Sequence, residues 1–118
     1  MNFYVKPFIK NCKEELGVDF SSTMALQEAA YSLAVQFGAT GGLTVCKNSG
    51  MTKNSTEEEI IKLLYAEKLR SIGTYKFLKC DKDTQEGVRS RFIREEKDIL
   101  EIFNSPSNLL INLNFQEH

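Results

Sequence analysis

The sequence has almost no histidine, a residue on which nucleophilic catalysis and many metal sites depend. Its 118 residues include no tryptophan and a single histidine, the final residue His118. Because chain ends are commonly mobile, we expect no Ser-His or Cys-His pair on a rigid scaffold and no histidine-based metal site. The sequence therefore predicts a protein that is not an enzyme and that uses no metal or other cofactor.

Cysteine is also scarce. Cys12, Cys46 and Cys80 are an odd set, and no pair has the C-x-x-C spacing of a zinc or redox motif. The N-terminus shows no secretory signal, so we expect reduced thiols in a cytoplasmic protein. Cys46 and Cys80 fall in predicted strands, where a buried, inert cysteine is more common than a reactive thiol.

Long apolar runs and an excess of one charge are missing as well. Glycines and polar residues interrupt the most apolar stretch, so no segment reaches the roughly 20 apolar residues of a membrane span. The 15 basic and 16 acidic residues give a net charge of −1, which argues against a dedicated duplex-DNA binder. A single-stranded nucleic-acid contact through Tyr75 and Phe77 is a weaker alternative, because no RNP-like motif accompanies them. We therefore expect neither membrane insertion nor nucleic-acid binding.

The stretch from Phe20 to Cys46 is what the sequence does offer, since Glu28 is its only charged residue. It predicts a helix over residues 23–37, capped by Ser21 or Ser22 and ended by Gly38. Helical spacing places one wide apolar face on Leu26, Ala29, Ala30, Leu33, Ala34 and Phe37. A second apolar face consists of Met24, Tyr31 and Val35. Either this helix is central to the fold, or the second face meets another protein, and it is our candidate interface.

The glycine-rich segment 38–42 could suggest a phosphate-binding loop. A phosphate loop lies between a strand and the start of a helix. Here the segment is expected to leave a helix and to bend into a short strand over residues 43–46, and no Gly-Lys-Ser/Thr follows it. We interpret it as a helix end and a tight turn.

Caps and periodicity set the remaining elements. Ser55 and Glu58 form a predicted capping box for a helix that stops at Gly73, and the other expected elements are a helix over 7–16, a strand over 74–80, a helix over 84–103 and a strand over 109–115. The sequence thus predicts one domain over 1–118, in the α+β or small α/β class. A three- to four-stranded sheet would pack against about four helices in the order α-α-β-α-β-α-β.

Charged residues on the predicted helices give the candidate ligand site. Arg91, Arg94 and Glu95 lie on the polar face of helix 84–103, whereas Arg89 and Glu96 project into the apolar sector formed by Val88, Phe92, Ile93, Ile99, Leu100 and Phe103. Lys68 projects into the apolar face of its own helix. Because an unpaired buried charge is costly, these residues must reach solvent at the core's edge, pair with one another or line a pocket.

Two functions follow from these patterns. The first is a non-enzymatic interaction module, such as an adaptor, a chaperone or an inhibitor of another protein, which also self-associates as a homodimer. The alternative is a binder of a small anionic ligand such as a nucleotide, held by the arginines of helix 84–103 with Lys68.

Overall fold

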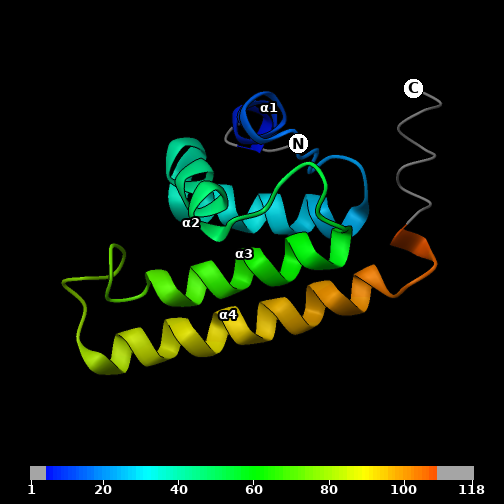
Figure 1. Ribbon diagram of the computed structural model, residues 1–118. Coiled ribbons are helices and arrows are strands. Elements are labelled where there is room, and N and C mark those ends of the chain that lie inside the picture. The colour runs from blue at the N-terminus through cyan, green and yellow to red at the C-terminus, as the bar shows by residue number, and fades with distance from the viewer. Residues whose placement is uncertain (1–4, 109–118) are drawn as a thin grey trace.

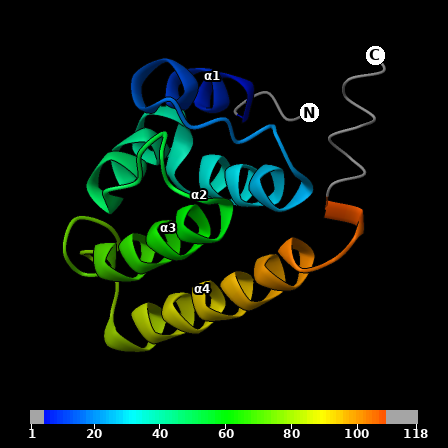
Figure 2. The same cartoon turned by 45° about the vertical axis from the view of Figure 1, so that its right-hand side comes forward.

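The structure, a computed structural model, describes residues 5–108, and these fold into four α-helices (Figure 1). The helices are α1 (Val5–Leu16), α2 (Met24–Ser49), α3 (Glu57–Ser71) and α4 (Lys82–Phe103). Figures 1 and 2 both show α3 and α4 side by side, running in opposite directions. α2 packs against each of the other three helices, whereas α1 packs on no helix of the described range other than α2. The domain is therefore organised around α2.

The predicted sheet is wrong for the part of the chain that the structure describes. Residues 43–46, expected as a strand, lie inside α2. Residues 74–80 form turns with one isolated bridge between Ile72 and Lys76 rather than a strand. The predicted strand over 109–115 lies outside the described residues. A short apolar run such as Leu43–Cys46 has no periodicity that separates a strand from a buried helix, and here burial against α1 selects the helix.

A kink at Gly38 divides α2 into two helical segments, 24–37 and 39–49. Gly38 has φ 77° and ψ 171°, a backbone conformation that is essentially restricted to glycine. The positive φ expected at Gly38 is present, but the chain then continues as a second helical segment. Figure 1 shows this segment turned away from the first and lying close to α1.

The starts of α2, α3 and α4 are capped by side chains, although not always by the predicted ones. The Thr23 hydroxyl accepts a hydrogen bond from the Leu26 amide at the start of α2, where Ser21 or Ser22 was expected. At α3 the capping box consists of Thr56 and Glu59, one residue later than predicted. Because Thr56 followed by Glu59 also satisfies the S/T-x-x-E pattern, the sequence allowed both registers.

The core lies where α2 meets its neighbours. All six residues of the predicted inner face of the first segment of α2 are buried, so that prediction is confirmed. Phe8 and Phe20 fill the space towards α1, with ring centroids 5.3 Å apart. The second segment adds further buried residues, which are Gly42, Leu43, Val45 and Cys46.

Candidate functional site

The second apolar face of α2 is largely exposed. Tyr31 is 47% exposed and Val35 54% exposed, while Met24 is half-buried. These three residues are four and seven positions apart, so they lie on the same side of the first helical segment. We call Met24, Tyr31 and Val35 the α2 face. Because Tyr31 and Val35 are exposed, this side of α2 is not buried inside the domain. The role of the α2 face as an interface stays a prediction.

A pocket of about 180 Å³ lies between α2 and α4, beside the α2 face. It is lined by Glu28, Ser32, Glu95, Asp98, Ile99 and Ile102. Glu28 and Ser32 are each three residues before a member of the α2 face, so the pocket and the face share one side of the helix. Three of the six lining residues carry carboxylates, which suits the pocket to a cationic group.

Glu95 is the point at which three helices meet through polar contacts. Gln36 of α2 donates a hydrogen bond from Nε2 to Oε1 of Glu95 at 3.0 Å. From α3, the Tyr65 hydroxyl at 3.4 Å and the Lys68 ammonium at 3.2 Å both donate to Oε2. The carboxylate is thus held by three donors at the wall of the pocket, and its position is fixed by the packing of α2 and α3.

Lys68 is completely buried beneath this carboxylate. Its Nζ lies 4.4 Å from the ring centroids of both Tyr65 and Phe92, an arrangement in which the rings attract the cation. Burial lowers the pKa of Lys68 to about 8; Glu95 opposes this change and Arg91 adds to it. Burial, followed by the charge of Glu95, raises the pKa of the Tyr65 hydroxyl well above its ordinary value. Lys68 therefore ties α3 to α4, and its ammonium is not accessible to a ligand from solvent.

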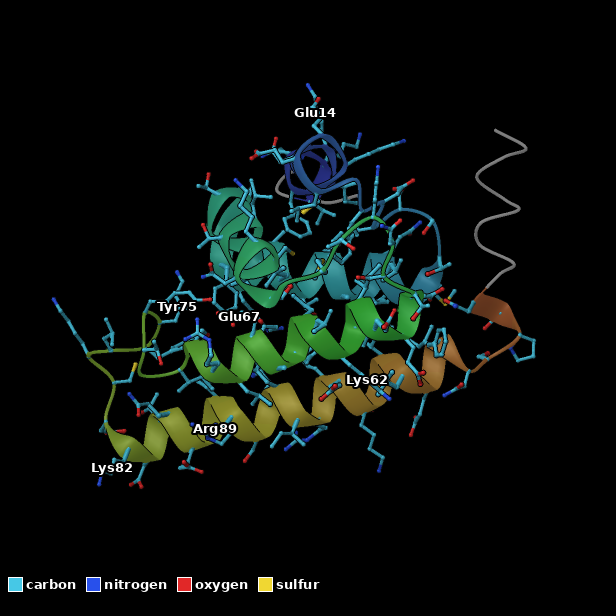
Figure 3. All side chains as sticks on the ribbon, viewed as in Figure 1. Glu14, Lys62, Glu67, Tyr75, Lys82 and Arg89 are labelled. Atoms are coloured by element: carbon cyan, nitrogen blue, oxygen red, sulfur yellow. The ribbon has the colours of Figure 1, made fainter. Side chains whose placement is uncertain are left out.

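The structure does not gather the five predicted ligand residues at one place. Glu96 is half-buried, and its pKa is raised by burial, an effect that Lys62 opposes. Arg89, labelled on α4 in Figure 3, forms an ion pair at 3.5 Å with Glu86 of the same helix. Arg91 and Arg94 are exposed and form no salt bridge within residues 5–108.

Glu28, Glu95 and Asp98 are the site residues that sequence reasoning missed. Glu95 had been placed only on the polar face of helix 84–103. The available signal was its position on the helical wheel, about 40° from Ile99 and about 60° from Phe92 at 100° per residue. Ile99 and Phe92 are both buried. A carboxylate that lies between their side of α4 and the polar side of the same helix is therefore at the edge of the core.

Tyr75 and Phe77, the residues considered for nucleic-acid stacking, are both engaged within the domain. Figure 3 shows Tyr75 beside Glu67, and its hydroxyl donates to Oε2 of Glu67 at 2.7 Å. Arg70 also donates to Glu67 and, as the main cause, lowers the pKa of that carboxyl. The Phe77 ring packs against Phe37 and Phe92, with centroids 6.4 and 6.3 Å away. These contacts anchor the connection between α3 and α4.

The glycine-rich segment 38–42 also differs from its prediction, since Gly38 forms the kink of α2 and residues 39–42 lie in the helical segment 39–49 rather than in a turn before a strand. It still follows a helix, and no Gly-Lys-Ser/Thr is present. Among residues 5–108, no three His, Cys, Asp or Glu side chains are grouped so as to hold a metal ion. In the same range, no helix combines the length and apolar character needed to cross a membrane.

One comparison with known proteins gives a match. Residues 2–97 match the family described as type VI secretion system spike protein VgrG3-like, C-terminal. No curated protein and no solved structure shows detectable similarity to the chain.

Proposed function

The chain belongs to the family of type VI secretion system spike protein VgrG3-like C-terminal domains, and on that premise we propose that it is a non-enzymatic protein-interaction module of such a spike. Membership of a spike-protein family supports the expectation that the chain binds other proteins of the type VI secretion system. The finer roles of adaptor, chaperone or inhibitor, and assembly as a homodimer, are forms that this interaction could take. The cytoplasmic location stays a prediction, because a secretion system moves proteins between compartments.

The observation that carries the proposal is the exposure of Tyr31 and Val35 one helical turn apart on α2. Single exposed apolar residues are ordinary on protein surfaces, but adjacent ones beside a pocket are typical of binding sites. Aromatic residues are enriched among those that dominate binding free energy, since they bury a large area with few rotatable bonds. We expect Tyr31 to be the anchor of the interface.

The neighbouring pocket adds a preference for charge. Glu28 and Asp98 are exposed at its walls, and no salt bridge within the described residues engages either one. A partner that places a lysine or arginine there, next to an apolar side chain on the α2 face, would complement both features. This favours a partner surface that is apolar with a basic edge.

The test compares two apolar residues of equal exposure. Val35 of the α2 face and Ile93 of α4 are each 54% exposed, but Ile93 projects from α4 about 160° away from Glu95, so it lies outside the pocket. We expect Val35→Glu and Tyr31→Glu to weaken binding to spike components of the same secretion system at least tenfold, while Ile93→Glu retains it. Equal binding by all three variants, or equal loss, would contradict the proposal.

The same variants test self-association. Light scattering at two concentrations gives the solution mass of the purified protein, and a homodimer built on the α2 face should dissociate in Val35→Glu and persist in Ile93→Glu. If the wild type is a monomer and still binds a spike component, the α2 face binds a different protein and the homodimer is excluded.

A second candidate function is the binding of a small anionic ligand by Arg91 and Arg94. Their exposure and lack of salt bridges within the described part of α4 favour it, whereas the buried Lys68 cannot contribute. A ligand that binds only the folded state raises its stability, so nucleotides or inorganic phosphate should raise the melting temperature of the wild type and not of Arg91→Ala/Arg94→Ala. No shift across a broad nucleotide panel would exclude this candidate.

A further inference from the structure

Cys12 and Cys46 lie at the contact between α1 and the second segment of α2, and both are fully buried. Two further contacts show how the two helices are aligned along their lengths. The Phe8 ring lies against Gly42, with Cδ1 and Cε1 each 3.0 Å from the position that a Cβ would take on that residue. Farther along both helices, Lys47 Nζ forms an ion pair with Glu15 Oε1 at 2.6 Å.

These two contacts bracket the cysteines. Cys12 lies one helical turn after Phe8, and Cys46 lies one turn after Gly42, so each points to the same side of its helix as the residue that makes the contact. Because α1 and the second segment of α2 run in the same direction, the register that pairs Phe8 with Gly42 also pairs Cys12 with Cys46. The interaction with the Cys12 side chain, followed by burial, raises the pKa of Cys46.

We propose that Cys12 and Cys46 form an intramolecular disulfide when the chain meets a disulfide oxidant. Two S–H bonds break and one S–S bond forms; two protons pass to solvent, and two electrons reduce the oxidant from one disulfide to two thiols. The reaction proceeds by thiol–disulfide exchange, in which one cysteine forms a mixed disulfide with the oxidant and the other displaces it. Small disulfides and protein disulfides of this class are present in oxidising compartments.

Access to the buried thiols depends on α1. This helix packs on α2 and on no other helix among residues 5–108, so it can separate locally without opening the contacts of α3 and α4. Opening exposes both sulfur atoms together, and reclosing brings them into contact. The resulting bond would fix α1 to α2 and close a loop of about 35 residues, which restricts the unfolded chain.

The inference goes beyond the proposed function, and only its biological setting rests on that function. A domain carried by a secretion-system spike would leave the reducing cytosol, and the bond would then form after export. The sequence-based expectation of reduced thiols would hold before export. The chemistry itself can be tested with no partner protein, so failure of the α2 face as an interface leaves this proposal unaffected.

The experiment uses the full chain, purified in reduced form and incubated with oxidised glutathione. Remaining thiols are then alkylated, and intact mass and peptide mapping are measured. We expect the protein to lose the mass of two hydrogen atoms, to retain one alkylated cysteine, Cys80, and to yield a Cys12–Cys46 crosslinked peptide. Cys80, half-exposed in the connection between α3 and α4, is the matched control, and Cys80→Ser should give the same bond.

The oxidised form should also have a higher melting temperature than the reduced form, and a reducing agent should reverse the difference. Incubation is repeated in urea below the unfolding transition, where α1 opens more often, and bond formation should become faster. Three free thiols under both conditions would overturn the proposal, as would a bond that includes Cys80 or joins two chains. Because removal of a buried cysteine can impair folding, this design requires no variant at Cys12 or Cys46.

Discussion

The ammonium of Lys68 lies 3.2 Å from the carboxylate of Glu95, and the lysine side chain is completely buried while the glutamate is 23% exposed. The pair is therefore asymmetric, because solvent can reach the anion but not the cation. Removing the anion leaves a buried charge without its partner, whereas removing the cation leaves a carboxylate that water and two other donors can still stabilise.

This asymmetry predicts unequal effects of the two single substitutions. Glu95→Gln should lower the free energy of unfolding by about 2–3 kcal/mol, a value reduced from that of a fully buried pair because Glu95 is partly exposed. Lys68→Met should leave the free energy of unfolding unchanged or raise it at neutral pH, since Met replaces the buried stem with an apolar chain of similar length and removes a buried charge whose pKa is lowered. Urea unfolding at neutral pH measures both. A larger loss in Lys68→Met than in Glu95→Gln would contradict the buried position of the lysine.

The lowered pKa of Lys68 also predicts a dependence of stability on pH. In the folded state Lys68 has a pKa of about 8, against an ordinary value of 10.5, so between these values the unfolded chain holds the proton more tightly. Stability contributed by this group therefore rises with pH across this window and is lower below pH 8, where the buried lysine is charged. Between pH 7 and pH 9.5, the wild type should gain about 2 kcal/mol relative to Lys68→Met.

Urea unfolding of both proteins across that range provides the measurement. The comparison stays below the ordinary pKa of tyrosine, because the raised pKa of Tyr65 lowers stability at higher pH. Subtracting the Lys68→Met curve removes the contributions of the other titrating groups, apart from changes in Glu95 and Arg91, which face the lysine. Parallel curves for the two proteins would show that Lys68 titrates normally.

The helices could largely be predicted from the sequence, but the sheet could not be distinguished from further helix. α3 and α4 have caps that mark their starts, and α1, α3 and α4 have periodic apolar residues along their lengths. The strand expected over 43–46 failed because Gly38, which does have a positive φ, was interpreted as the end of helical structure. A kink and an end require the same glycine conformation, and packing against α1 decides between them.

The pocket could not be predicted because its walls come from helices far apart in the sequence. Ile93 also widened the apolar sector assigned to α4, although it is 54% exposed. Including it shifted that sector towards Arg89 and Glu96 and away from Glu95. The pattern placed Lys68 in the apolar face of its helix, but the partner carboxylate depends on how α4 is rotated against α3, and tertiary packing sets that rotation.

The register of the capping box at α3 gives another prediction. Thr56 accepts a hydrogen bond from the Glu59 amide, and Glu59 accepts one from the Thr56 amide, whereas the Ser55 hydroxyl accepts from the Thr52 amide in the preceding turn. Thr56→Ala should therefore lower the free energy of unfolding by about 1 kcal/mol. Ser55→Ala should lower the free energy of unfolding by less, since the hydrogen bond that Ser55 accepts is exposed and lies outside the helix. The reverse order in urea unfolding would restore the register predicted from Ser55 and Glu58.

Gly38 and Gly87 provide a matched test of the kink in α2. A Cβ added at either residue would meet no atom within 4 Å, so neither substitution by alanine creates a clash. Gly38→Ala should still lower the free energy of unfolding by about 1–3 kcal/mol, because alanine is strained at φ 77° and ψ 171°. Gly87 lies inside α4 without a positive φ, and Gly87→Ala should raise it by up to about 1 kcal/mol, since alanine has the higher helix propensity. If urea unfolding shows that the two substitutions change the free energy of unfolding in opposite directions, the backbone conformation at residue 38, rather than a steric clash, holds the two segments of α2 at their angle. A neutral or stabilising Gly38→Ala would mean that α2 can straighten there, and the α2 face would then extend past Val35.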